Sequence, residues 1–288
     1  MNRTAIVGLR RSLGFWLASP RLSAGLLISL AFIVLGFILP LLAPADPRAW
    51  YTAPRNRPAS LHHLLGTTNL GQDIFWLLTW SLRNSLLLGL AVGLFSTLIG
   101  IAAGLVAGYR GGWIDRVLCF LMDAFLCIPS LPVLVLLAAL LNGSASLPAI
   151  CLILVLFNWP FPARQIRAVA LSMREREFIN VAWFSGESTT RIISRHIFPY
   201  IASWSAANFI NTVLVGIALE TSLAVIGLSN AQQTTLGTMI YWALKYQALL
   251  GRRYIWIGTP VAAIVVMFIG LFLVSSGIAG RSSLRRGA

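Results

Sequence analysis

Six apolar stretches, each about as long as a lipid bilayer is thick, dominate this 288-residue sequence. A hydrocarbon core of about 30 Å requires about 20 consecutive apolar residues in a helix. The stretches cover approximately residues 22–43, 85–109, 113–140, 147–170, 199–228 and 254–278. They are continuously apolar rather than alternating, which favours helices over the strands of a barrel. The sequence therefore predicts an all-α membrane protein with about six transmembrane helices.

The composition supports the same class of protein. Hydrophobic residues make up 58% of the chain and charged residues only 10%, whereas a soluble domain carries about 25% charged residues. Most of the surface must therefore face lipid. The net charge is +14, but the arginines lie in short loops between apolar stretches. That placement suits membrane lipid headgroups, so we expect lipid and no nucleic acid as a partner.

The distribution of basic residues predicts the orientation in the membrane. If the N-terminus is inside and the six helices alternate, 15 basic residues fall inside and 7 outside. Positively charged loops favour the cytoplasm, so we expect a multi-pass inner or plasma membrane protein with both termini cytoplasmic. The basic start resembles a signal peptide, but its apolar run exceeds the 7–15 residues of a signal core. We expect an uncleaved first helix.

Several kinds of chemistry are not expected of this chain. Its three cysteines, Cys119, Cys127 and Cys151, lie in apolar stretches without a pairing motif, and its histidines lack ligand spacing. We therefore expect no disulfide and no metal site. A phosphate-binding P-loop requires the pattern G-x-x-x-x-G-K-[ST]. Lys245, the only lysine, follows Ala243 and Leu244, so no P-loop and no catalytic residue are expected.

Two connections are too long to be simple turns. The first, residues 44–83, is proline-rich and ends in an apolar segment, residues 74–82, that contains Trp76 and Trp80. This segment suits a short helix at the outer interface. We expect three regions along the chain. Residues 1–80 would hold an N-terminal interfacial helix, the first transmembrane helix and a periplasmic segment; residues 81–280 would form the transmembrane domain, and residues 281–288 a cytoplasmic tail.

The second long connection, residues 164–199, predicts a helix–turn–helix lying along the cytoplasmic face. Phe178, Ala182 and Trp183 recur with helical period on one face. Gly186 interrupts the pattern, and Ser188 can cap a second helix over residues 189–197. We expect Pro199 to end this second helix and to begin the next transmembrane one.

This connection resembles the cytoplasmic coupling loop of type I ABC importer permeases. The family pattern is Glu-Ala-Ala, three residues, Gly, and later an apolar residue, Leu and Pro. The corresponding residues here are Asn180, Val181, Ala182, Gly186 and Pro199, so Asn replaces the family Glu and Val the first Ala. The resemblance implies that these residues, with Glu187, form a helix that sits in a cleft of an ATPase. Gly186 would permit a tight turn and a close approach.

Further motifs are similar to the shorter-loop permease subunit of dipeptide and oligopeptide importers. They are Leu65-Gly66-Thr67, Leu70-Gly71-Gln72-Asp73, the run from Gly108 to Asp115, Asp123 with Ile128-Pro129, the run from Arg174 to Phe178, the run from Arg195 to Pro199, and Glu220-Thr221-Ser222-Leu223. The resemblance implies the type I permease fold and half of a translocation path for di- or oligopeptides. Importers of oligosaccharides and nickel have similar permeases and are the alternatives.

The resemblance also implies a set of partners. These are a second homologous permease subunit, two ABC ATPase subunits and an extracytoplasmic substrate-binding protein. ATP and Mg would then be bound by the ATPase subunits, and this chain would bind no cofactor.

Polar residues inside the predicted helices are candidates for a path or gate. Asp123, Asn208, Asn211 and Glu220 are costly in a bilayer and normally face a bundle interior or a water-filled path. Each is also consistent with helix-to-helix hydrogen bonding, and Asp123 with a loop arginine. A stripe of glycines in the second helix favours close helix packing; its members are Gly89, Gly93, Gly100, Gly104 and Gly108.

Two other functions remain open from the residues alone. A secondary transporter would use intramembrane acids such as Asp123 and Glu220 for ion coupling, but such proteins usually carry internal repeats, and none is evident here. A membrane scaffold that transports nothing would leave the polar residues inside the spans without a role.

Overall fold

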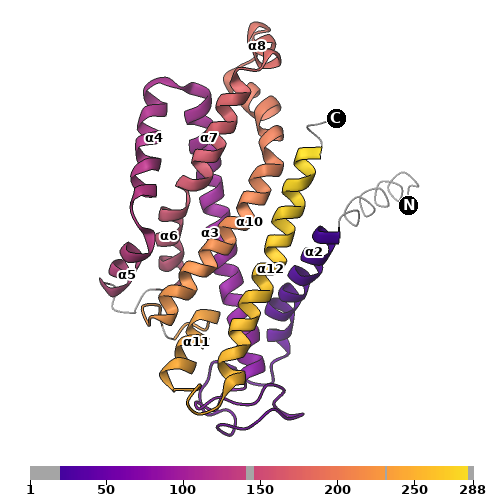
Figure 1. Ribbon diagram of the computed structural model, residues 1–288, viewed down its shortest axis with the longest axis vertical. Coiled ribbons are helices and arrows are strands. Elements are labelled where there is room, and N and C mark those ends of the chain that lie inside the picture. The colour runs from indigo at the N-terminus through magenta and orange to yellow at the C-terminus, as the bar shows by residue number, and fades with distance from the viewer. Residues whose placement is uncertain (1–19, 141–145, 231, 285–288) are drawn as a thin grey trace, which may run out of the picture.

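The computed structural model describes residues 20–140, 146–230 and 232–284, which form a bundle of long helices (Figure 1). The expected N-terminal interfacial helix and the last four residues of the predicted tail lie outside the described residues. The elements are α2 (Pro20–Ile33), η1 (Val34–Ile38), η2 (Leu39–Leu42), α3 (Ile74–Arg110), α4 (Gly112–Cys127), α5 (Ser130–Leu140), α6 (Leu147–Asn158), α7 (Pro160–Arg174), α8 (Glu177–Phe184), α9 (Thr189–Ile192), η3 (Ile193–Ile197), α10 (Phe198–Val225), α11 (Leu236–Lys245) and α12 (Tyr254–Leu284).

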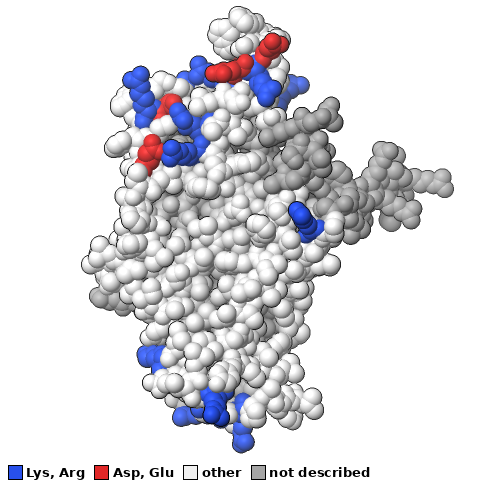
Figure 2. Space-filling view, in the orientation of Figure 1, with Lys and Arg blue, Asp and Glu red and all other residues white. Residues whose placement is uncertain are grey.

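The expected all-α membrane architecture is confirmed. Five helical segments of the described chain are long and apolar enough to cross a membrane; they are Pro20–Leu42, Ile74–Arg110, Leu147–Arg174, Trp204–Val225 and Tyr254–Ile278. The pair α4 and α5 supplies a sixth if its 78° bend is counted within one span. Charged side chains gather at the two ends of the bundle and leave the middle largely uncharged (Figure 2), as a bilayer requires.

The predicted interfacial helix over residues 74–82 is wrong, because these residues begin the 37-residue helix α3. Asp73 caps this helix by accepting hydrogen bonds from the amides of Phe75 and Trp76. Two polar residues, Arg83 and Asn84, lie between the predicted interfacial segment and the predicted second span, and both have partners within the folded chain. The side-chain amide of Asn84 donates to the Thr234 carbonyl at 2.7 Å, and the Arg83 guanidinium lies 5.0 Å from the ring centroid of Trp80.

Prolines mark the breaks in the next two spans. The chain bends between α4 and α5 at Ile128 and Pro129, and α6 gives way to α7 at Pro160. Proline lacks the amide that would continue the ladder of backbone hydrogen bonds. The fourth span continues to Arg174, beyond the predicted end at residue 170.

The glycine stripe of α3 is a packing surface, as expected. A Cβ atom added to Gly104 would lie 2.5 Å from the Ala163 carbonyl oxygen in α7, and one added to Gly89 would lie 2.5 Å from the Ile217 side chain in α10. Small residues let helix backbones approach closely where lipid gives no hydrophobic drive for association. The stripe therefore holds α7 and α10 against α3.

The two ends of the bundle carry different structures (Figure 1). One end carries α8, and both the start of α2 and the end of α12 point toward it. The other end carries α11 and the segment of residues 44–73. This segment is held together by backbone hydrogen bonds, including Tyr51 N–H to Leu70 O at 2.8 Å and Ala53 N–H to Gly71 O at 2.9 Å. We call the two the α8 end and the α11 end.

Candidate functional site

The α8 end is built around a tight turn at Gly186. The Gly186 amide donates to the Trp183 carbonyl at 3.0 Å, and the Glu187 amide donates to the Ala182 carbonyl at 3.2 Å. This pair of bonds is a Schellman motif, in which the residue after the helix adopts a left-handed backbone. Gly186 does so with φ +79°. The expected tight turn is confirmed, whereas a Cβ atom added to Gly186 would meet nothing within 4 Å in the described chain.

The second short helix begins as predicted. Ser188 precedes α9, and its hydroxyl accepts a hydrogen bond from the Arg191 amide at 3.4 Å. Glu187 lies beside this cap and is half-buried, with Oε2 3.1 Å from His196 Nε2. The turn between α8 and α9 is therefore fixed by one backbone motif, one side-chain cap and one side-chain pair.

Helix α8 presents large apolar side chains to its surroundings. Val181 is 64% exposed, Trp183 63% and Phe184 81%, and Asn180 next to Val181 is also exposed. Of the three residues predicted to share a face, Phe178, Ala182 and Trp183, only Ala182 is buried, so they do not form one buried face. Exposed apolar patches of this kind mark interaction surfaces.

The other side of this loop is anchored in the bundle. Ile179 and Ala182 of α8 belong to one buried cluster with residues of α7, η3 and α10, among them Ile166, Ala170 and Ile197. The loop is therefore apolar on two sides, one packed inside the protein and one uncovered.

Pro199 does not end a helix as predicted. The chain is helical from Thr189 through η3 to Val225, and η3 is a π-helical segment closed by a hydrogen bond from the Phe198 amide to the Ile193 carbonyl. A π-helical turn inside an α-helix absorbs one extra residue. Pro199 follows this segment in the first turn of α10, where its missing amide is tolerated.

Asp123 takes part in an ion pair between α4 and α7. Its Oδ1 lies 3.1 Å from Nη1 of Arg164, and both side chains are more than half exposed. A second pair, Asp115 with Arg167, joins the same helices and is more buried, with side chains 18% and 27% exposed. Sequence reasoning missed this second pair, because nothing in the sequence gives the register of α4 against α7.

Glu220 connects three elements at the α11 end. Its side chain is fully buried, and Oε1 accepts a hydrogen bond from the Thr235 hydroxyl at 2.7 Å. Thr235 caps α11, and the next amide, that of Leu236, donates to the Ser85 hydroxyl of α3 at 3.0 Å. Oε2 of Glu220 has no hydrogen-bond partner among the described residues.

The two asparagines of α10 lie in different surroundings. Asn211 is exposed, and its Oδ1 accepts a hydrogen bond from the Ser275 hydroxyl of α12 at 3.1 Å. Asn208 is 4% exposed, and its Nδ2 has no partner in the described part of the chain. The four polar residues predicted for a path or gate, Asp123, Asn208, Asn211 and Glu220, thus belong to separate contacts rather than to one cluster.

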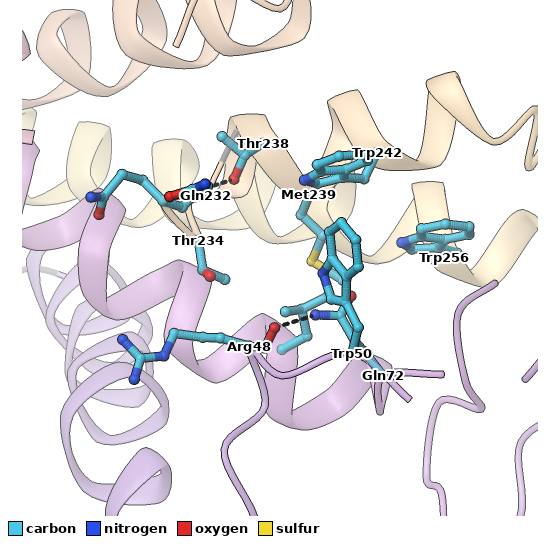
Figure 3. Close-up of a pocket in the computed structure, with 11 residues that line it drawn as sticks. Arg48, Trp50, Gln72, Gln232, Thr234, Thr238, Met239, Trp242 and Trp256 are labelled. Atoms are coloured by element: carbon cyan, nitrogen blue, oxygen red, sulfur yellow. Dashed lines mark hydrogen bonds between the residues drawn. The ribbon is translucent and has the colours of Figure 1, made fainter. Parts of the chain in front are cut away.

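A pocket of about 380 Å³ opens at the α11 end. Figure 3 shows three tryptophans on one side of it, Trp50, Trp242 and Trp256. Gln72 is fixed below them because its Nε2 donates to the Arg48 carbonyl at 3.0 Å. The Arg48 guanidinium instead lies 4.7 Å from the Trp80 ring centroid and pairs with Asp46. Sequence reasoning missed this pocket, because its lining comes from segments far apart in the sequence.

Comparisons with known proteins match most of this chain. The pattern that defines the binding-protein-dependent transport system inner membrane component family matches residues 97–286. The oligopeptide transport system permease protein OppC of Mycobacterium tuberculosis is 33% identical over 185 residues, 64% of each chain. The dipeptide transport system permease protein DppC of Alkalihalophilus pseudofirmus is 33% identical over 61% of this chain and 57% of its own length. OppC of Bacillus subtilis is 27% identical over 88% of this chain and 83% of its own.

Proposed function

Because this chain belongs to the family of binding-protein-dependent transport system inner membrane components, we propose that it is the permease subunit of an ATP-binding-cassette importer. It forms half of a translocation path for di- or oligopeptides. The observation that carries the proposal is the α8 loop, which is apolar on an anchored side and on an uncovered side. Such a loop can bind a partner and transmit force to the helices behind it.

The uncovered side of α8 is the surface we assign to an ATPase subunit. Val181, Trp183 and Phe184 supply apolar area at the end of the bundle, and aromatic anchors of this kind carry much of the binding energy of protein interfaces. ATP and Mg would bind to the ATPase, so hydrolysis takes place outside this chain. The complete machine has two ATPases, a second homologous permease and an extracytoplasmic binding protein.

The orientation follows from the same assignment. The α8 end is cytoplasmic, since soluble ATPase subunits have access to ATP there. The start of α2 and the end of α12 point toward that end (Figure 1), which supports a cytoplasmic location for both termini. The larger share of basic residues on this side agrees with the charge bias of cytoplasmic loops. The α11 end then faces the binding protein.

The proposed substrates are peptides because the relatives are oligopeptide and dipeptide permeases by name. Importers of oligosaccharides or nickel would use the same machinery, but the relatives favour peptides. The matched region spans only 64% of the Mycobacterium tuberculosis relative. The peptide assignment therefore needs a direct test of which substrates stimulate ATP hydrolysis.

The experiment is to tag this chain, co-express it with its neighbouring genes, and purify the complex into lipid nanodiscs. ATP hydrolysis is then measured with the co-encoded binding protein and with panels of peptides, oligosaccharides and nickel. We expect an ATPase to co-purify and peptides to stimulate hydrolysis. Absence of both a co-purifying ATPase and hydrolysis would contradict the proposal and leave a secondary transporter. Stimulation by another panel alone would contradict the peptide assignment.

A further inference from the structure

A second pocket at the α11 end, of about 490 Å³, shares Trp256 with the first. Three arginines line it, Arg57 from the segment of residues 44–73, and Arg252 and Arg253 from the turn before α12. Its other lining residues are mostly apolar and include Leu65, Ile74, Ile255 and Trp256. No Asp or Glu is among the residues described as lining it.

The positive charge of this pocket is not neutralised by the described residues. The segments around it contain two acids, and both are engaged elsewhere. Asp46 pairs with Arg48, and Asp73 caps α3 and lies 2.8 Å from His63. None of the ion pairs formed within the described ranges includes the three pocket arginines. Figure 2 shows Lys and Arg without Asp or Glu at this end of the visible face. The pocket is therefore suited to an anion.

Arg252 occupies a backbone position that suits glycine better. Its φ is +55°, in the left-handed region that L-residues with a Cβ atom adopt only under strain. The turn is closed by bonds from the Arg252 amide to Leu249 O at 3.1 Å and from the Arg253 amide to Ala248 O at 2.8 Å. A strained residue that carries a charge into a pocket suggests that the charge is used there.

Trp256 forms part of the apolar wall of this pocket. Its side chain is 1% exposed and also lines the first pocket. The second pocket thus combines three guanidinium groups with apolar side chains.

An exposed apolar face of α12 leads away from the pocket toward the middle of the bundle. Its members recur at intervals of three and four residues, and they are Ile255, Gly258, Ala262, Val265, Ile269 and Phe272. At 1.5 Å per residue this face is about 26 Å long. A basic pocket that continues into a long apolar face matches a molecule with an anionic head and an apolar tail.

We propose that this pocket binds the phosphate of an anionic phospholipid headgroup, with an acyl chain along the exposed face of α12. Arg57, Arg252 and Arg253 would contact the phosphate oxygens, since guanidinium groups match phosphate geometry. Tyr254, where the spanning segment of α12 begins, lines the pocket, and most of the other lining residues apart from the arginines are apolar. Those two features favour a lipid over an acidic protein loop. The inference requires membrane insertion alone and does not depend on the proposed import function.

The test uses the full chain in nanodiscs that contain equal amounts of phosphatidylglycerol and phosphatidylcholine with the same acyl chains. Lipids retained after transfer to detergent are counted by native mass spectrometry. We expect the wild type to retain phosphatidylglycerol preferentially. Arg252→Gly with Arg253→Gln should lower that preference by roughly fivefold per arginine, the equilibrium equivalent of the contribution of one basic residue near a membrane surface. Arg252→Gly relieves backbone strain, so the loss would not arise from misfolding.

Arg55→Gln is the matched control. Arg55 lies at the same end, 4.4 Å from the Tyr51 ring centroid, but it does not line the pocket; the preference should survive this change. Equal retention of the two lipids by the wild type, or an unchanged preference in the double variant, would overturn the proposal. If the protein in phosphatidylcholine discs binds inorganic phosphate as tightly as it binds phosphatidylglycerol, the lipid proposal would also be overturned and the pocket assigned to a soluble anion. If the double variant retains lipid as the wild type does but its ATP hydrolysis is stimulated less by the binding protein, the pocket would be assigned to a protein partner instead.

Discussion

Arg167 of α7 donates to both carboxylate oxygens of Asp115 in α4, with Nε 2.5 Å from Oδ1 and Nη2 2.8 Å from Oδ2. Such two-point contacts fix orientation as well as distance. The thiol of Cys119 donates to the same carboxylate at 3.3 Å. Because α7 leads directly into the α8 loop, this contact ties α4 to the helix that supports the proposed ATPase-binding surface.

The Asp115 pair should stabilise the protein more than the Asp123 pair does. Replacing Arg167 with Gln leaves a partly buried carboxylate without its partner, which we expect to cost roughly 1–3 kcal/mol in the free energy of unfolding. Asp123→Asn should cost about 1 kcal/mol or less, because that pair is more than half exposed. Thermal unfolding in nanodiscs measures both. Equal shifts for the two variants would contradict this ranking.

Asp123 remains a predicted path or gate residue, and the same variant tests that role. If Asp123 lines the path, Asp123→Asn should reduce uptake while the complex assembles and keeps its thermal stability. Unaltered uptake together with normal assembly would remove Asp123 from the path.

The left-handed backbone of Gly186 should be needed to couple ATP hydrolysis to transport. Alanine at φ +79° is strained, and Gly186→Ala should cost about 1–2 kcal/mol locally. We expect fewer substrate molecules imported per ATP hydrolysed, with normal membrane insertion. Gly112 is the control, because its φ is +63° and an added Cβ atom there also meets nothing within 4 Å. If Gly112→Ala reduces coupling equally, the effect is not specific to the α8 loop.

The exposed aromatic residues of α8 should determine ATPase binding. Trp183→Ala removes a large side chain that packs little within the described chain, so insertion and thermal stability should be preserved. We expect the amount of co-purified ATPase to fall by tenfold or more, as for an aromatic interface anchor. Trp113→Ala is the matched control, since Trp113 is 68% exposed and lies in the first turn of α4. Equal loss of ATPase from both variants would show that α8 is not the specific contact.

Glu220 and Thr235 should be coupled in stability. Glu220→Ala and Thr235→Val each remove one partner of a buried hydrogen bond, and each should cost about 1–3 kcal/mol. The double variant should cost less than the two single changes together, because the bond can be lost only once. Glu220→Gln keeps an oxygen acceptor and should be milder. Strict additivity in thermal unfolding would show that the bond does not stabilise α11.

The sequence predicted the helices well because the requirement of about 20 apolar residues is strong and local. It failed where polar residues are stabilised by distant segments. The predicted interfacial helix over residues 74–82 stopped short of two polar residues, Arg83 and Asn84, yet Asn84 is paired with Thr234, 150 residues away. A helix need not break at a polar residue whose hydrogen bond is formed in the folded state.

The candidate site was predictable in its local parts only. The turn at Gly186 and the cap at Ser188 depend on neighbouring residues, and both formed as expected. The contacts of Asp115 and Glu220 depend on how helices far apart in sequence align, which no local pattern encodes. The π-helical turn before Pro199 was also missed, because it comes from one extra residue in a helix rather than from a terminating signal.

The helical run from Thr189 to Val225 is unbroken, so α9, η3 and α10 can move as one rigid rod. The run is about 55 Å long. Glu220 lies near its far end and accepts the hydrogen bond from Thr235, the cap of α11. A tilt of about 5° in a rod of that length would carry one end roughly 5 Å sideways relative to the other. A small displacement at one face of the membrane would thus be transmitted to the opposite face along one continuous helix backbone.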